Sequence, residues 1–220
     1  MPEDERFSAI LKFCTLETAR IKYELHIFRG LYGSDPRRVE VLNRAAPEIA
    51  QLLQDLLFDD IVIRLCRLLD PPEDRRGNVN FGLRLLIALA PKDTSLELAT
   101  EVEVAFDLAA KLKERRDKHI AHNDGNSKRA DCAKGWVSLA DIQAALDRID
   151  DVVVRLHLTC RKVSIETDPI LAREPEMALL RALHLGADAL DKARDDYLQR
   201  AMHDRGHVPK PLAWLPDWLR

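Results

Sequence analysis

The densest group of reactive side chains in this sequence lies in residues 115–124, which read RRDKHIAHND. Five of the first eight residues are arginine, lysine or histidine, and the imidazoles of His119 and His122 are three positions apart. At about 100° per residue these two histidines share one helical face, with Arg115 nearly in line with His122 two turns away. Arg116 lies further round, but its long side chain can swing toward His122. The segment therefore groups acid–base and anion-binding side chains at one helix end, just before a glycine loop.

These side chains suit phosphodiester chemistry. An imidazole has an unperturbed pKa of about 6.5, so it can take up or release a proton at cellular pH. A guanidinium can hold two phosphate oxygens and stabilise the charge that builds up during the reaction. RNA supplies its own nucleophile, the 2′-hydroxyl, so this chemistry requires no metal. We expect no cofactor.

Two other interpretations of the same segment remain open. Basic residues at a helix C-terminus complement the helix dipole and cap its carbonyls, and spacing alone gives this structural role equal weight. A metal site formed by His119, His122 and Asp124 is the weaker interpretation. The neighbouring Arg115 and Lys118 would repel a cation, and no acidic helix stands out to complete the ligand set. We therefore predict no metal.

The charge pattern is local rather than global. The net charge is −3 and the pI is about 6.2, which argues against a general nucleic-acid coat protein with a broad basic surface. Residues 111–134, however, hold eight basic and four acidic side chains. Taken alone, a solvated helix face explains this excess better than an anion-binding site does.

The composition also limits the classes of protein to which this chain can belong. No apolar run reaches the roughly 20 residues that span a bilayer, and the N-terminus is too acidic for a signal peptide. We expect a cytoplasmic protein that does not bind membranes. The four cysteines are scattered along the chain and form no C-x-x-C pair, which predicts neither disulfides nor a thiolate metal site.

Apolar residues recur at steps of three and four, which predicts an all-α helical bundle. No stretch shows the sustained alternation that is typical of strands. We expect long helices over residues 7–32, from Pro47 to the stop at Asp70, from Thr94 into the reactive segment, and over about residues 175–204. At least three should exceed 18 residues.

The sequence also predicts where several helices begin and which of their faces are buried. Asn80 is predicted to cap a short helix that runs to Ala90. Thr94 with Glu97, and Ser138 with Asp141, are spaced as capping boxes that open two further helices. The periodic apolar side chains of the long helices are expected to face the core, and they include Ile49, Leu52, Leu53 and Leu96.

Residues 116–124 resemble the R-x(4–6)-H motif of HEPN domains, with Arg116 followed by a polar residue and then by His122. The spelling is most similar to the abortive-infection, AbiU-like branch of that superfamily. Residues 64–71, RLCRLLDP, and 77–80, GNVN, resemble the helix end and loop that precede the motif in this branch. The resemblance covers about residues 45–160.

The resemblance implies an all-α, HEPN-like bundle. We expect this bundle over residues 1–164, and an additional C-terminal helix with a proline-broken tail over 165–220. HEPN proteins are usually homodimers, and the narrow apolar seam of the first predicted helix also favours self-association.

The resemblance also implies an endoribonuclease that cuts RNA without metal in phage defence or as a toxin. RNA and an antitoxin protein are then the expected partners. His122 would be the general acid or base, Arg116 would stabilise the phosphorane, and Asp117 would orient Arg116. The remaining polar residues are candidate RNA contacts, namely Arg115, Lys118, His119 and Asn123. The alternative is a catalytically inactive HEPN-like module that binds RNA, a nucleotide or a protein.

Overall fold

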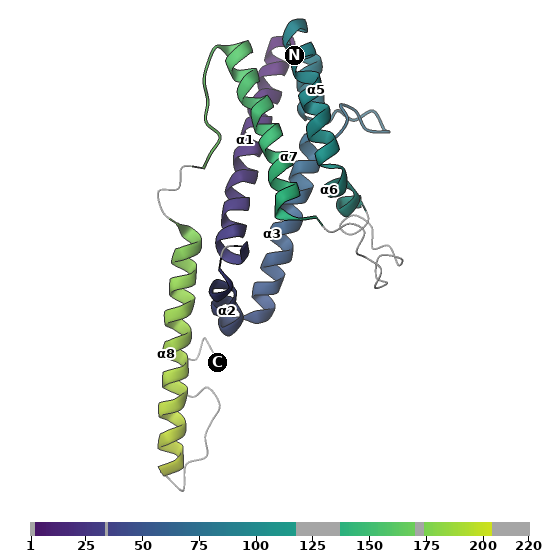
Figure 1. Cartoon of the computed structure of the whole chain (residues 1–220). Coiled ribbons are helices and arrows are strands. Elements are labelled where there is room, and N and C mark those ends of the chain that lie inside the picture. Colours follow the sequence, from purple (N-terminus) through teal and green to yellow (C-terminus); the bar gives the residue numbers. More distant parts are fainter. Residues whose placement is uncertain (1–2, 34, 118–136, 170–173, 204–220) are drawn as a thin grey trace. The chain divides into compact units, whose positions relative to one another are not determined.

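The computed structural model describes residues 3–33, 35–117, 137–169 and 174–203. Within these ranges the regular structure is helical, and the only β-type pairing is one isolated bridge between Glu73 and Val79 (Figure 1). The all-α prediction is therefore confirmed. In the described stretches, no helix is both long enough and apolar enough to cross a membrane.

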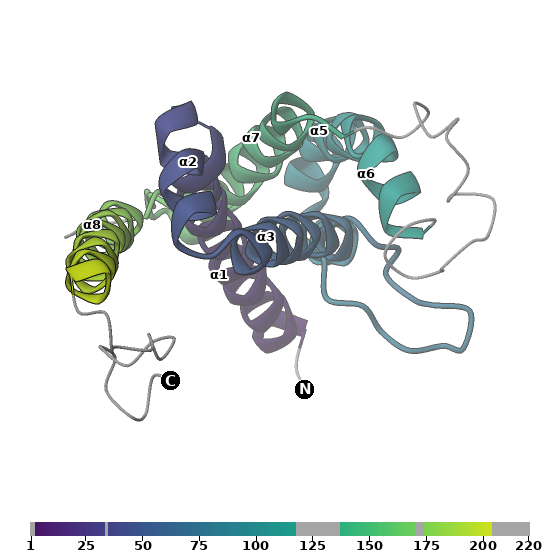
Figure 2. The same ribbon diagram turned by 90° about the horizontal axis from the view of Figure 1, so that it is seen from below.

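The chain forms two compact units, one of Met1–Phe28 with Gln54–Ala172 and one of Arg29–Leu53 with Arg173–Arg220. In the first unit, α7 lies between α1 and α5 and packs against both (Figures 1 and 2). The short helix α4 contacts α1 and α5, and α6 contacts α5 and α7. The helices with residues in this unit are α1 (Glu3–Phe28), α3 (Pro47–Leu68), α4 (Leu83–Leu89), α5 (Lys92–Leu108), α6 (Ala110–Arg115) and α7 (Leu139–Leu156), followed by the π-type turn η3 (His157–Arg161).

Helix α7 is the central helix of the first unit. Its buried side chains recur at helical spacing, and they are Ile142, Ala145, Leu146, Ile149, Val152, Val153 and Leu156. The predicted capping box is present at its start: the Asp141 amide donates to Ser138 Oγ at 3.1 Å, and the Ser138 amide donates to the Asp141 carboxylate at 2.9 Å. The sequence therefore fixes both where this helix begins and which face it buries.

Replacing Ser138 by alanine should lower the free energy of unfolding by about 1 kcal/mol, because one amide at the start of α7 loses its acceptor.

Hydrogen bonds from the side chain and backbone of Ser138, together with Lys111, lower the pKa of Asp141 to about 2. A carboxylate with a lowered folded pKa stabilises the protein above its unfolded pKa, so the stability difference between wild type and Asp141→Asn should shrink as the pH falls from about 4 to 2. Urea titrations measure both effects. Ser95→Ala in α5 is the control, and an equal loss there would contradict the capping role.

The lengths of the long helices agree with expectation. Helix α1 has 26 residues, α3 has 22 and α8 (Pro175–His203) has 29, so three helices of the described ranges exceed 18 residues. Helix α3 begins at Pro47 and ends just before Asp70-Pro71-Pro72, as predicted from the position of the prolines.

The predicted third long helix is interrupted. Helix α5 begins at Lys92 after Pro91, without a side-chain cap, so the Thr94–Glu97 capping box is wrong. The helix breaks at Ala109, whose φ of −82° and ψ of 0° depart from helical values, and α6 follows as a separate six-residue helix. Asn80 does not cap α4 either, because Gly82 takes that position.

Some apolar side chains that were expected in the core are exposed. Leu96 is 69% exposed, Ile49 56% and Leu52 53%. In α3 the apolar side chains were expected to be buried from residue 49 onward, but they form a regular buried face only from Ile61. Leucines and isoleucines lie on more than one face of these helices, so periodicity alone did not identify the buried face.

The second unit contains η1 (Arg29–Gly33), α2 (Pro36–Ala45), the start of α3 and α8. Helix α2 packs on α8, where Arg44 pairs with Asp188 at 2.6 Å and with Asp191 at 2.5 Å. The backbone of Gly30 lies against the side chain of Glu176, and a Cβ at position 30 would lie 2.4 Å from Glu176 Cγ. Only glycine fits this contact without displacing that side chain.

Candidate functional site

The break at Ala109 determines where the first part of the reactive segment lies. Ala109 and Leu112 are buried, so α6 is packed on the first unit rather than projecting into solvent. Lys111 at the start of α6 pairs with Asp141 of α7 at 3.1 Å. The helical path continues through Arg116 and Asp117 with a wider π-type turn. A π-type turn reorients side chains and is frequent at functional sites.

Arg115 is held against α3. Its Nη2 donates to Asp59 Oδ1 at 2.9 Å, and its guanidinium lies 4.8 Å from the centre of the Phe58 ring. About 29% of the Arg115 side chain is exposed. The pair and the ring contact fix the direction of this guanidinium while part of it still faces solvent.

Arg116 bridges two carboxylates. Its Nη1 donates to Asp70 Oδ1 at 2.9 Å, and its Nε donates to Asp117 Oδ1 at 2.8 Å. The Arg116 side chain is only 20% exposed, against 53% for Asp117. Asp70 directly follows α3, so this contact joins the end of α3 to the start of the motif.

The electrostatic surroundings keep Arg116 charged. Burial by itself lowers the pKa of a guanidinium, but the hydrogen bonds to Asp70 and Asp117 outweigh it and raise the pKa of Arg116 above its ordinary value. Burial raises the pKa of the nearby Cys66 thiol to about 11, so Cys66 is a neutral thiol at cellular pH. The fixed charges beside Arg116 are therefore carboxylates, not a thiolate.

The space next to this cluster is narrow. A cavity of about 10 Å³ lies between Cys66, Asp70, Phe106 and Lys113. This volume is about that of one water-sized sphere, so it cannot receive a nucleotide.

The structure describes three of the seven predicted site residues. Arg115, Arg116 and Asp117 lie at one end of α6, where Arg116 donates a hydrogen bond to Asp117; the roles of these residues in catalysis stay predictions. The other four, Lys118, His119, His122 and Asn123, lie outside the described residues.

Sequence reasoning missed the two carboxylates, one on α3 and one just after it, that hold the two arginines. Asp59 and Asp70 are 56 and 46 positions from their partners. Asp70 gave one usable signal, because an acidic side chain at a helix C-terminus is unfavourable unless a cation compensates it. Asp59 gave none, since aspartates in the middle of a helix are ordinary on a solvated face.

Within the described ranges, no three histidine, cysteine or carboxylate side chains are grouped so that they could hold a metal ion. His119, His122 and Asp124, which were weighed as ligands, lie outside those ranges.

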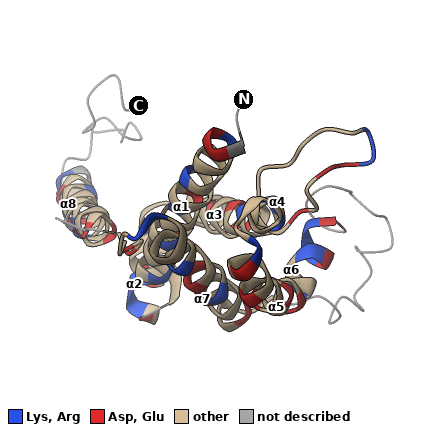
Figure 3. Ribbon diagram, turned by 90° about the horizontal axis from the view of Figure 1, so that it is seen from above, with Lys and Arg blue, Asp and Glu red and all other residues tan. Residues whose placement is uncertain are grey.

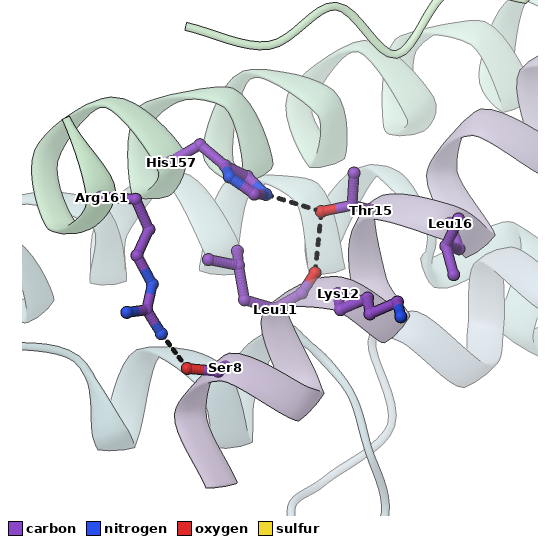
Figure 4. A pocket seen from close by; sticks show the side chains of 7 residues that line it. All are labelled: Ser8, Leu11, Lys12, Thr15, Leu16, His157 and Arg161. Atoms are coloured by element: carbon purple, nitrogen blue, oxygen red, sulfur yellow. Dashed lines mark hydrogen bonds between the residues drawn. The ribbon is translucent and has the colours of Figure 1, made fainter. Parts of the chain in front are cut away.

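A separate cavity of about 270 Å³ lies between α1 and η3 (Figure 4). Thr15 donates its hydroxyl proton to the Leu11 carbonyl, so His157 Nε2, 2.9 Å away, must be the donor to Thr15 Oγ1. Burial and Arg161 lower the pKa of His157, which keeps the imidazole neutral. Arg161 donates to Ser8 across the cavity mouth. This arrangement joins α1 to the end of α7 and lies apart from Arg116.

Comparison with known proteins identifies the family. The model of AbiU2, a HEPN family, matches residues 4–174. No curated protein and no solved structure matches the chain significantly. With its all-helical fold, the protein is of the HEPN class. The chain belongs to the AbiU2 family, and the match extends beyond residues 45–160 to include α1 and α2.

Proposed function

We propose that this protein is a metal-independent endoribonuclease of the HEPN type that acts in phage defence or as a toxin. One observation carries the proposal: in a member of the AbiU2 family, Arg116 is held by Asp70 and Asp117 at the start of the segment that contains His122. A guanidinium that is already oriented stabilises a developing phosphorane without reorganising during the reaction.

In the proposed reaction the 2′-hydroxyl of RNA attacks the adjacent phosphorus. His122 takes the proton of that hydroxyl, and Arg116 binds the non-bridging oxygens as negative charge accumulates on them. The bond from phosphorus to the 5′-oxygen then breaks. The leaving oxygen takes up a proton, and the products are a 2′,3′-cyclic phosphate and a 5′-hydroxyl.

The site is proposed to be shared by two subunits of a homodimer. A single imidazole cannot easily both accept the proton of the 2′-hydroxyl and protonate the leaving oxygen in one concerted step. Two copies of His122, one from each subunit, can divide these roles. The basic excess of residues 111–134 would then be doubled around the cleft and would concentrate RNA there.

The dimer is testable by mass. Light scattering at micromolar concentration should give about twice the chain mass of 25.1 kDa. A mass equal to one chain under those conditions would contradict the shared site, because the second histidine would have no source.

One observation favours a second function. Both carboxylates that contact Arg116 hold it in an ion-pair network, and its side chain is four-fifths buried. A purely structural arginine would look the same. The alternative is therefore a catalytically inactive HEPN-like module that binds RNA, a nucleotide or a protein such as an antitoxin.

Activity separates the two functions. The purified protein should be incubated with a mixed RNA pool in excess chelator, and RNA binding should be measured in parallel. Cleavage supports the endoribonuclease. Binding without cleavage of any RNA supports the inactive module.

A further inference from the structure

Internal hydrogen bonds hold residues 70–82, in the loop between α3 and α4. At its tip, the Asp74 carboxylate accepts hydrogen bonds from the amides of Arg76 at 2.7 Å and Asn78 at 2.9 Å, and from the Asn78 side chain at 2.8 Å. These bonds lower the pKa of Asp74. Gly77 has a φ of +79°, which closes the turn and favours glycine.

Both ends of this loop are also anchored. The Asn80 amide donates to the Pro72 carbonyl at 2.9 Å, and the Asn80 side chain donates to the Pro71 carbonyl at 2.9 Å. At Gly82, an added Cβ would lie 2.8 Å from the Leu68 carbonyl oxygen, so the last part of the loop packs closely against the end of α3. The loop is therefore a fixed projection of the first unit.

Two arginines occupy the tip. The side chains of Arg75 and Arg76 are exposed, and no described carboxylate lies within ion-pair distance of either. By contrast, Arg115 and Arg116 are each paired with an aspartate. The loop thus holds two hydrated guanidinium groups whose backbone is already positioned, which suits contact with a polyanion.

The loop starts at the motif. Its first residue, Asp70, is the partner of Arg116, and Arg75 is five residues further on. Five residues span at most about 17 Å. Figures 2 and 3 show the loop and α6 on the same side of the first unit, and Figure 3 shows basic residues at the tip of the loop and on α6. A strand of RNA with one phosphate at Arg116 can therefore reach the loop within a few nucleotides.

We propose that the 70–82 loop is a second RNA-contacting element, in which Arg75 and Arg76 hold the phosphate backbone a few nucleotides from the phosphate bound at Arg116. The inference rests on the proposed function, because it needs RNA at the motif. It assigns the loop a positioning role and explains why an exposed loop is held by so many internal hydrogen bonds. Ordering the loop in advance reduces the entropy lost on binding.

The first test removes the two charges. Arg75→Gln/Arg76→Gln should weaken binding of a single-stranded RNA of about 12 nucleotides by roughly tenfold, and lower the slope of log K against log salt by about 1.4, which is 0.7 for each lost phosphate contact. Cleavage of the shortest substrates should be unchanged, because they do not reach the loop.

The matched control is Lys12→Gln/Lys92→Gln, which makes the same charge change at two exposed lysines. Lys92 lies at the opposite end of α5 from α6, and α5 is about 25 Å long. The control should change affinity and salt slope little. Equal losses in both double variants would overturn the inference, because the effect would then reflect net charge alone.

The second test removes the hydrogen bonds at the tip of the loop and leaves Arg75 and Arg76 in place. Asp74→Ala makes the protein more positive, so simple electrostatics predicts tighter RNA binding. The loop inference predicts weaker binding, by about threefold or more, with an unchanged melting temperature. Tighter binding would overturn the positioning role.

The endoribonuclease proposal and the loop inference are tested by different measurements, cleavage for the first and RNA affinity for the second. If wild type binds RNA without cutting it, the endoribonuclease proposal fails, while the affinities of the loop variants still decide the inference. If wild type cuts RNA and Arg75→Gln/Arg76→Gln matches it in affinity and salt slope, the inference fails and the endoribonuclease stands. If wild type binds no RNA, the inference fails with it.

Discussion

Replacing His122 by alanine should abolish RNA cleavage, with a rate loss of about 10²- to 10⁴-fold, because the reaction loses the group that moves the proton. RNA binding should persist, since the arginines that attract phosphate remain. The helical content by circular dichroism and the mass by light scattering should match wild type. Single-turnover cleavage at saturating protein measures the chemical step directly.

The matched control for this variant is His184→Ala. His184 is an exposed histidine of α8 whose Nε2 lies 3.5 Å from Asp188 Oδ2 of the same helix. This variant should cleave RNA at the wild-type rate. Full activity in His122→Ala would remove the catalytic assignment, whatever the control does.

Replacing Arg116 by lysine should have the second-largest effect, a loss of roughly 10²-fold in the rate of cleavage. Lysine keeps the positive charge near Asp70 and Asp117 but lacks the planar fork that holds two phosphate oxygens. Because an ion pair with Asp70 can still form, the melting temperature should fall by only a few degrees. Single-turnover rates and thermal unfolding should be measured on the same preparation.

The purely structural interpretation of Arg116 predicts a different pattern. In that case Arg116→Lys should lose stability, and cleavage should fall only in proportion to the unfolded fraction. Asp70→Asn is the companion variant, since it removes the charge partner and leaves the guanidinium in place. If Asp70 only orients Arg116, Asp70→Asn should lower the cleavage rate less than Arg116→Lys and should leave RNA affinity nearly unchanged. Wild-type rates in Arg116→Lys would contradict the catalytic role.

Local signals in the sequence were sufficient for much of the fold. The capping box at Ser138 and the apolar stripe of α7 are both set by residues a few positions apart, so they could be found without knowing the packing. The prolines at positions 47, 71 and 72 bound α3 for the same reason.

The break at Ala109 could not be found in this way. Alanine is the strongest helix former, and the flanking residues continue the apolar period, so the sequence predicts an unbroken helix. The structure instead ends α5 at Leu108 and starts α6 at Ala110, with the buried Ala109 between them at a non-helical ψ of 0°. Nothing within a few residues of Ala109 marks this break.

In the candidate site, too, contacts between sequence neighbours could be predicted, and contacts between distant residues could not. Arg116 and Asp117 are neighbours in sequence, so their contact could be predicted. Asp70 approaches Arg116 only because the end of α3 and the end of α6 lie together in the fold. A single sequence carries no spacing rule for such a pair.

We propose that this chain cuts RNA with its own side chains and the 2′-hydroxyl of the substrate. The most direct measurement is a cleavage time course with purified wild-type protein and a mixed RNA pool in excess chelator, beside the same RNAs methylated at the 2′-oxygen. We predict cleavage of the unmodified RNA at a rate that the chelator does not change, and no cleavage of the methylated RNA. Cleavage of the methylated RNA, or cleavage only after divalent ions are added, would contradict the account.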